Sequence, residues 1–123
     1  MKQVRLMNIQ IFGTAKCFDT KKAQRFFKER RIKVQFVDLA RFGMSKGELR
    51  SVKTALRCKT EDLISEKAKA GDAAVVAYLA SEEAKEEKLL ENQTWFKTPI
   101  VRNGKQATLG VQPDVWKQWE AQG

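Results

Sequence analysis

Three successive segments at the start of the chain have the hydrophobic periods of a strand, a helix and a second strand. Residues 4–12 alternate apolar and polar side chains, which predicts a strand because neighbouring strand residues face opposite sides. Residues 18–31 place apolar residues at helical spacing among lysines and arginines, and this predicts an amphipathic helix. Alternation returns over residues 33–39 and predicts the second strand. Strands joined by a helical crossover pair in parallel with a right-handed connection, so the chain begins with a β-α-β unit.

The centre of the chain carries helix-start signals instead of strand patterns. Ser45 is followed three residues later by Glu48, a capping box that predicts a helix to about residue 56. Three further N-cap candidates begin helical segments. Thr60 predicts a short helix to residue 69, Asp72 can cap the apolar stretch over residues 73–80, and Ser81 predicts a helix to residue 90. We therefore expect a helical insertion over about residues 44–95.

The end of the chain returns to strand and turn signals. Residues 98–102 have the pattern of a short strand, and Asn103-Gly104 is the strongest short hairpin signal. The returning strand is expected over residues 106–109. Pro113 suits the first turn of a closing helix, which we expect over residues 114–121.

The order of these segments predicts the fold class. A β-α-β unit, a helical block and a β-β-α unit together indicate an α/β protein with a thioredoxin-like, mixed four-stranded sheet. We expect one domain over residues 1–123, with the helical insertion between the second and third strands. An apolar share of 42% in 123 residues is sufficient for one hydrophobic core.

The composition excludes several chemistries. The chain has no histidine, so neither an imidazole general base nor a histidine metal ligand is available. Two cysteines are too few for a four-cysteine zinc site or a disulfide scaffold, and we expect no metal and no bound cofactor. The longest apolar run, residues 73–80, is far shorter than the ~20 residues that span a bilayer. We therefore expect a soluble cytoplasmic protein with no membrane partner.

The net charge of +9 is concentrated in the first half of the chain. Residues 1–60 carry 16 Lys+Arg and 4 Asp+Glu, a net charge of +12, whereas residues 61–123 carry 8 and 11, a net charge of −3. A basic half can attract nucleic acid, small anions or an acidic protein, or it can be a solvated surface. The charge alone does not separate these alternatives.

Cys17 is the principal candidate for chemistry. It follows the first strand and a short loop and begins the first helix, where free backbone N–H groups and the helix dipole favour an anion. Lys16 adds positive charge beside it. Such surroundings lower the pKa of a cysteine from about 8.5 and produce a nucleophilic thiolate at neutral pH. The alternative is a buried structural cysteine.

Three more residues are candidates to support this thiol. Thr20 follows Cys17 by three residues, so it could donate a hydrogen bond to the thiolate, or it could lie on the helix surface; its presence excludes a Cys-x-x-Cys pair. Pro99 after Thr98 suits a strand start, with either a trans or a cis peptide bond. Arg57 offers a planar fork of donors for an oxyanion, or it is an ordinary surface arginine.

Four segments resemble the ArsC/Spx family of arsenate-reductase-like proteins. Residues 9–23 (IQIFGTAKCFDTKKA) resemble the opening of the family, and residues 56–60 (LRCKT) resemble its arginine-bearing segment. Residues 98–101 (TPIV) are similar to its cis-proline strand, and Gly110-Val111 to the turn before its final helix. The resemblance covers about residues 7–119. It implies a thioredoxin-like fold and a bacterial, cytoplasmic thiol oxidoreductase.

The resemblance also implies roles and partners. Cys17 is expected to attack the substrate and form a covalent adduct. The residues expected at the site are Cys17, Arg57 and Thr20 for catalysis and Lys16, Thr98 and Pro99 for substrate binding. The implied substrate is a small thiol or an oxyanion such as arsenate, with electrons supplied by glutathione or by a glutaredoxin or thioredoxin.

Two arginines of the arsenate-binding members have no match in this chain. Thr98 stands where one of them precedes the proline, and residues 108–110 contain no equivalent of the later one. A charge-assisted hydrogen bond contributes roughly 1.5–3 kcal/mol, so these replacements weaken the expectation of arsenate binding. Threonine before proline is instead similar to glutaredoxins, which bind glutathione.

The Spx branch of the family supplies a non-enzymatic alternative, a transcriptional regulator that binds RNA polymerase. Thr20 replaces the second cysteine of the redox switch that is frequent in that branch. Polymerase binding itself does not need the switch, and the basic first half of the chain is compatible with it. We expect no direct nucleic-acid binding in either case.

Cys58 directly follows Arg57 in the sequence. If Arg57 lies at the site as the resemblance implies, Cys58 could resolve an oxidised Cys17 by forming an intramolecular disulfide. The alternative is an inert thiol that points away from the site.

Overall fold

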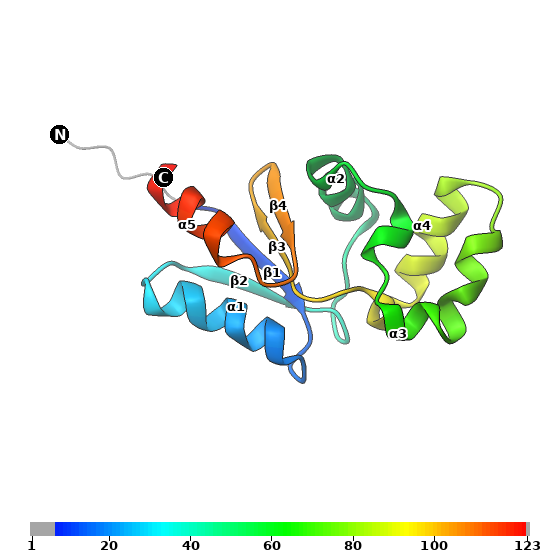
Figure 1. Ribbon diagram of the computed structural model, residues 1–123, viewed down its shortest axis with the longest axis horizontal. Helices are drawn as coiled ribbons and strands as arrows, with labels where there is room; N and C mark the ends of the chain where they lie inside the picture. The colour runs from blue at the N-terminus through cyan, green and yellow to red at the C-terminus, as the bar shows by residue number, and fades with distance from the viewer. Residues whose placement is uncertain (1–6, 123) are drawn as a thin grey trace.

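The first and last parts of the chain together form a four-stranded mixed sheet. The computed structural model describes residues 7–122, and its strands are β1 (Ile9–Gly13), β2 (Val34–Asp38), β3 (Ile100–Asn103) and β4 (Gln106–Leu109). Their order across the sheet is β2-β1-β3-β4 (Figure 1). β1 and β2 are parallel, and the other two pairs are antiparallel. The predicted thioredoxin-like sheet is confirmed, although residues 4–6 of the first predicted strand lie outside the described residues.

Helices α1 (Phe18–Glu29) and α5 (Pro113–Gln122) pack on one face of the sheet. The alternation in β1 explains this, because Ile9 and Ile11 face these helices whereas Phe12 faces the opposite side. Trp116 of α5 lies at the centre of this layer, where it packs against Phe27 of α1. Both predicted helices are confirmed, and their ends differ from the prediction by one or two residues.

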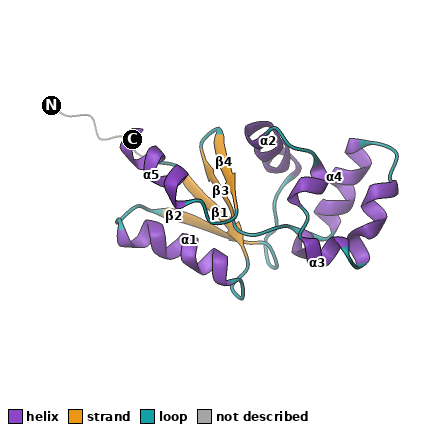
Figure 2. Ribbon diagram, in the orientation of Figure 1, coloured by secondary structure: helices purple, strands orange, loops and turns teal. Residues whose placement is uncertain are grey.

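The helical insertion lies between β2 and β3, and its apolar side chains share a core with Phe12 and Ile100 on the other face of the sheet. Its first helix lies beside the sheet, and the rest of the insertion extends away from it (Figure 2). Its elements are α2 (Lys46–Leu56), the 3₁₀ turn η1 (Thr60–Leu63), α3 (Glu66–Lys69), η2 (Asp72–Tyr78), α4 (Glu82–Glu91) and η3 (Gln93–Trp95). The predicted capping box of α2 is confirmed: Ser45 Oγ accepts from the Glu48 N–H at 3.1 Å, and the Glu48 carboxylate accepts from the Ser45 N–H at 2.9 Å.

The single helix predicted over residues 60–69 is wrong. Ile64 is extended, with φ −95° and ψ 134°, and forms a bridge with Phe96, which interrupts the helix. Ser65 then caps the short α3 by accepting a hydrogen bond from the Ala68 N–H at 3.1 Å. Thr60 is not the cap of its segment; it lies in the first turn of η1, and its hydroxyl donates to Glu82.

The insertion is held together by a cluster of charged groups that we call the Lys53 network. Lys53 Nζ lies 2.8 Å from a carboxylate oxygen of Glu82 and 2.7 Å from one of Glu86. Its ammonium also donates to the Thr60 hydroxyl at 2.9 Å, and Arg50 pairs with Glu86 at 3.2 Å. These contacts join α2, η1 and α4 into one unit.

Within residues 7–122, no helix is long and apolar enough to cross a membrane. The same residues contain no group of three side chains of the metal-binding types placed to hold an ion.

Candidate active site

The turn between β1 and α1 places Cys17 at the N-cap of the helix, directly before its first residue. The Cys17 N–H donates to Thr14 O at 3.2 Å, and the Cys17 carbonyl accepts the first helical hydrogen bond from the Lys21 N–H at 3.1 Å. Cys17 has the extended backbone of an N-cap residue, with φ −83° and ψ 119°. Its side chain therefore lies where the free N–H groups of the first turn and the helix dipole create positive potential. This confirms the predicted position of the thiol at the start of a helix.

Thr98 makes the firmest side-chain contact with the thiol. Its hydroxyl donates to Cys17 Sγ at 3.1 Å, and the same sulfur lies 3.9 Å from the Thr98 carbonyl oxygen. The peptide bond between Thr98 and Pro99 is cis, as in the family strand that this segment resembles. Pro99 itself is buried.

Thr20 lies beneath the thiol and is completely buried, so it is not the surface threonine of the alternative interpretation. Its hydroxyl has no hydrogen bond of regular geometry with any described residue, but it acts on the thiol as a donor at longer range. The packing around it is tight, because a Cβ at Gly13 would collide with the Thr20 side chain. Glycine at position 13 therefore makes room for a hydroxyl next to the sulfur.

The surroundings of Cys17 favour its thiolate form. Burial is the largest single effect and raises the pKa of the thiol. The donors around the sulfur outweigh burial: the hydroxyls of Thr20 and Thr98 and the N–H groups of Thr20 and Asp19 hold the pKa of Cys17 below its ordinary value. A larger fraction of the thiol is therefore ionised, and nucleophilic, at neutral pH.

Cys17 opens into a cleft of about 840 Å³ between the end of the sheet and the insertion. The residues that line it are Thr14, Lys16, Cys17, Ser65, Glu66, Lys67, Phe96, Lys97, Thr98, Leu109 and Gly110. The charged residues among them are three lysines (Lys16, Lys67 and Lys97) and one carboxylate. That carboxylate, on Glu66, lies 3.7 Å from Lys97 Nζ and 3.3 Å from Lys69 Nζ. The cleft is consequently suited to an anionic substrate.

The predicted site residues divide into two groups. Lys16, Cys17 and Thr98 line the cleft, Thr20 lies under the sulfur, and Pro99 is buried directly after Thr98. Arg57 and Cys58 are not among the lining residues.

Arg57 is exposed at the end of α2. It adopts the left-handed conformation, with φ +53°. The Arg57 N–H donates to Thr54 O and the Cys58 N–H to Lys53 O, the paired bonds of a Schellman motif. The catalytic role of Arg57 stays a prediction.

Cys58 lines a different pocket of about 340 Å³, together with Thr54 and three residues of the Lys53 network, Arg50, Lys53 and Glu86. Its half-buried side chain packs against the core under the insertion. Burial, followed by the negative charge of Asp62, raises the pKa of the Cys58 thiol. The two cysteines therefore have opposite chemical character, and both are free thiols.

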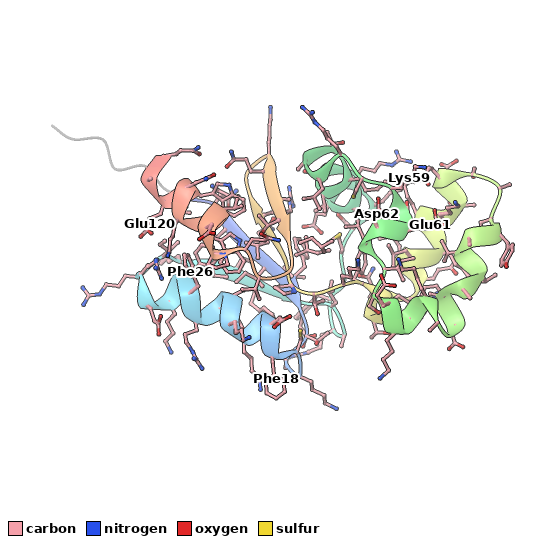
Figure 3. The ribbon with its side chains drawn as sticks, in the orientation of Figure 1. Phe18, Phe26, Lys59, Glu61, Asp62 and Glu120 are labelled. Atoms are coloured by element: carbon pink, nitrogen blue, oxygen red, sulfur yellow. The ribbon has the colours of Figure 1, made fainter. Side chains whose placement is uncertain are left out.

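The sequence alone does not predict the cleft residues that come from the insertion and its flank, nor the exposed aromatic residue next to Cys17. Ser65, Lys67 and Lys97 reach the cleft only through the docking of the insertion, so no local pattern marks them. Phe18 follows Cys17 and is 77% exposed, and its ring projects from the start of α1 (Figure 3). The signal for Phe18 was present in the sequence, since it is a large apolar side chain within a run of polar residues.

Comparisons with known proteins identify the fold. No protein-family model matches the chain, and no curated protein matches it. Among solved structures, an arsenate reductase from Vibrio cholerae superposes with a TM-score of 0.79 at 18% identity, over 93% of this chain and 98% of that one. A provisionally assigned ArsC family related protein from Bacteroides fragilis gives 0.78 at 16% identity, over 93% and 98%. An arsenate reductase (ArsC) related protein from Brucella melitensis gives 0.60 at 18% identity, over 96% and 98%.

These similarities extend over nearly the whole chain and include the helical insertion. The chain therefore has the fold of ArsC family and arsenate-reductase-like proteins, which confirms the fold that the four sequence segments imply.

Proposed function

We propose that this protein is a thiol-dependent reductase in which Cys17 is the nucleophile. The observation that carries the proposal is the position of its sulfur: at the start of α1, 3.1 Å from a hydroxyl donor, and open to a cleft of about 840 Å³ with three lysines. The likeness in fold to proteins described as arsenate reductases supports the same class of reaction.

The reaction proceeds through a covalent adduct on Cys17. With a disulfide substrate, the thiolate attacks one sulfur, the second sulfur leaves as a thiolate, and a mixed disulfide forms. An external thiol such as glutathione then attacks the substrate sulfur of the mixed disulfide, which releases Cys17 as a thiolate and forms a new disulfide between the two external groups. A second external thiol attacks that disulfide and releases the substrate as a thiol, so the two external thiols together supply the two electrons. With an oxyanion such as arsenate, the Cys17 thiolate displaces a hydroxide, which leaves as water after protonation, and external thiols again supply two electrons.

Each neighbouring group has a definite part in this proposal. The Thr98 hydroxyl and the free N–H groups of α1 stabilise the attacking thiolate and, later, the same thiolate as a leaving group. Lys16, Lys67 and Lys97 attract the carboxylates of a glutathione-like thiol or the charge of an oxyanion. Arg57 would complete the anion site if the end of α2 moved toward the cleft.

The rate of alkylation of Cys17 across pH tests the proposal. In the Cys58→Ser variant, Cys17 is the only thiol, and we expect its pKa to lie below about 8.5. Arsenate or oxidised glutathione, added separately, should slow alkylation by occupying the cleft or by forming the adduct on Cys17, and the stronger protector identifies the substrate class. A pKa near 8.5 together with no protection by either compound would contradict the proposal, and Cys17→Ser gives the background rate.

The alternative function, a non-catalytic regulator that binds RNA polymerase, is supported by the charge distribution. Seven cations lie in α1 and the turn after it, at Lys21, Lys22, Arg25, Lys28, Arg30, Arg31 and Lys33, and they give the protein a surface for an acidic partner. Capture of purified polymerase by the tagged protein, with the Cys17→Ser variant binding equally well, would favour this function over thiol chemistry.

A further inference from the structure

The groove between α1 and the free edge of β2 has features that thiol chemistry does not use. We infer that this groove binds an acidic segment of another protein in extended conformation, as an added strand beside β2. The inference is independent of the proposed thiol chemistry, because it rests on the other end of α1 and on a sheet edge; three of its cations belong to the basic surface of the alternative function.

The backbone of β2 supports the addition of a strand. β2 is an edge strand, and within residues 7–122 only β1 pairs with it. The Leu39 N–H donates to Gly13 O at 2.9 Å, so at Leu39 the backbone groups face β1. Since these groups alternate in direction along a strand, the N–H and C=O groups of Val34 and Phe36 face outward. They form a row of donors and acceptors that an extended peptide can pair with.

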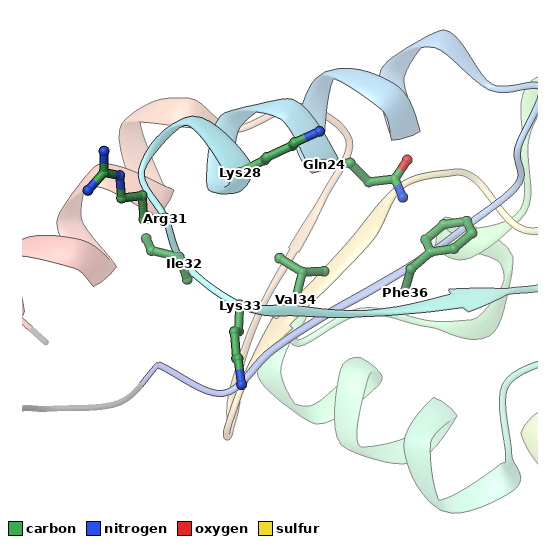
Figure 4. A pocket seen from close by; sticks show the side chains of 7 residues that line it. All are labelled: Gln24, Lys28, Arg31, Ile32, Lys33, Val34 and Phe36. Atoms are coloured by element: carbon green, nitrogen blue, oxygen red, sulfur yellow. The ribbon is translucent and has the colours of Figure 1, made fainter.

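The groove beside this edge gives room for the side chains of the added strand. It has a volume of about 440 Å³ and is lined by Gln24, Lys28, Arg31, Ile32, Lys33, Val34 and Phe36. Figure 4 shows the side chains of Val34 and Phe36 rising from β2 toward α1, with Gln24 and Lys28 extending from the helix above them. Alternate side chains of an added strand would point to the same side of the sheet as Val34 and Phe36, into this groove.

Charge selects an acidic occupant. Lys28, Arg31 and Lys33 are all exposed, and none has an ion pair with any carboxylate in residues 7–122. Arg30, by contrast, pairs with Glu120 at 3.3 Å. Three cations without counter-charges therefore border the groove. Lys28 extends over it from α1, whereas Lys33 points to the opposite side of β2 from Val34 and Phe36 (Figure 4), where the other side chains of an added strand would lie.

The backbone of Arg31 is a second, independent observation. Arg31 has φ +58°, and its N–H donates to Lys28 O while the Ile32 N–H donates to Phe27 O. This is the Schellman position at a helix end, where glycine is commonest because other residues are strained there. An arginine at this position adds a cation to the end of the groove, at the expense of backbone stability; its guanidinium extends outward from that end (Figure 4).

A second copy of this chain does not fit the same edge. Pairing two β2 edges would bring two sets of Lys28, Arg31 and Lys33 together, and like charges in such proximity repel. An acidic strand instead neutralises them.

A synthetic peptide that alternates glutamate with valine, carrying a fluorescent label, is the probe for this inference. We expect the full-length protein to bind it, measured by fluorescence anisotropy, and the amides of Val34 and Phe36 to become protected from hydrogen exchange. Lys28→Glu/Lys33→Glu should weaken binding by about tenfold or more, which corresponds to 1.4 kcal/mol. Lys105→Glu/Lys117→Glu makes the same charge change on other exposed surfaces and should bind nearly as well as the natural chain.

Three further arms separate strand addition from simple charge attraction. A peptide with N-methyl groups at alternate residues keeps its charge but loses backbone donors, and it should bind much more weakly. Arg31→Gly should weaken binding of the peptide, while the circular dichroism spectrum of the variant keeps its α-helical signal. Three outcomes would each overturn the inference. The methylated peptide could bind as well as the original peptide, or the control pair of charge reversals could weaken binding equally. The third is that a single-stranded oligonucleotide binds more tightly than the peptide and that Lys28→Glu/Lys33→Glu abolishes its binding.

Discussion

Arg57 occupies a backbone conformation that a glycine would adopt at lower cost. A left-handed conformation costs a residue with a side chain roughly 1–2 kcal/mol, and Arg57 has φ +53°. We therefore expect Arg57→Gly to raise the free energy of unfolding by about 1 kcal/mol, measured by urea denaturation. If the guanidinium acts in the reaction, the same variant loses activity.

Arg57→Ala is the matched control, because it removes the guanidinium and keeps the left-handed backbone. It should lose activity as Arg57→Gly does, without the gain in stability. Full activity in both variants would show that this arginine, exposed at the end of α2, takes no part in the chemistry.

Thr98 is the residue through which the reactivity of Cys17 can be altered with least disturbance. Its hydroxyl donates to the sulfur at 3.1 Å, and this hydrogen bond lowers the pKa of the thiol. Thr98→Val preserves the shape and removes the donor, so the pKa of Cys17 should rise and alkylation at pH 7 should slow by several-fold. Thr98→Ser restores a donor and should restore most of the rate; a Ser variant as slow as Val would assign the effect to packing.

At the level of elements, the Lys53 network predicts how the insertion responds to acid. The hydrogen bond from Lys53, with a further contribution from Thr60, lowers the pKa of Glu82 to about 2. Burial acts to raise the pKa of Glu86, but Lys53 and Arg50 outweigh it and the pKa is lowered. A carboxyl whose pKa is lower in the folded state than in the unfolded state stabilises the fold at pH values above its unfolded-state pKa of about 4.3. This contribution is lost as the pH falls toward about 2.

We therefore expect the free energy of unfolding to fall between about pH 4.5 and 2, as the carboxylates of the Lys53 network become protonated. Glu86→Gln should reduce the slope of stability against pH in this range, since it removes one of the titrating groups. Circular dichroism during urea titrations at each pH measures this. An unchanged slope in Glu86→Gln would assign the acid response to other carboxylates.

Lys53→Met tests the same network at neutral pH. It leaves the carboxylate of Glu86, whose side chain is 6% exposed, with Arg50 as its one remaining ion-pair partner among residues 7–122. We expect a loss of about 2–3 kcal/mol in the free energy of unfolding, below the usual cost of breaking a buried pair because Arg50 remains. Lys46→Met, which breaks the exposed pair with Glu83, should cost under about 1 kcal/mol.

The sequence predicts those elements whose signals are local. β1 and β2 alternate because one side chain in two faces a helix layer, and Asn103-Gly104 specifies the hairpin between β3 and β4. The helix predicted over residues 60–69 fails because Ile64 pairs with Phe96, thirty-two positions away, a contact that no local pattern contains. The site divides in the same way: the position of Cys17 follows from the strand-loop-helix order, whereas Ser65 and Lys97 join it only through tertiary docking.

At the level of the whole molecule, the two cysteines belong to different parts of the fold. Cys17 lies between the sheet and the cleft, whereas Cys58 lies within the insertion beside the Lys53 network. The pKa of Cys17 is lowered and that of Cys58 is raised by burial and then by Asp62. A protonated thiol in a separate pocket reacts slowly with an oxidised Cys17, so the structure favours an external thiol as the resolving group.

Mild peroxide treatment in the presence of glutathione should therefore yield a glutathione adduct on Cys17 and leave Cys58 reduced. Peptide mapping by mass spectrometry measures both outcomes in one digest, and Cys58→Ser should give the same yield of the Cys17 adduct. A peptide linking Cys17 to Cys58 would reverse this assignment, because it would show that Cys58 leaves its own pocket and reaches the cleft together with the end of α2. That movement would carry Arg57 with it, so the same linked peptide would also support the anion-binding role predicted for this arginine.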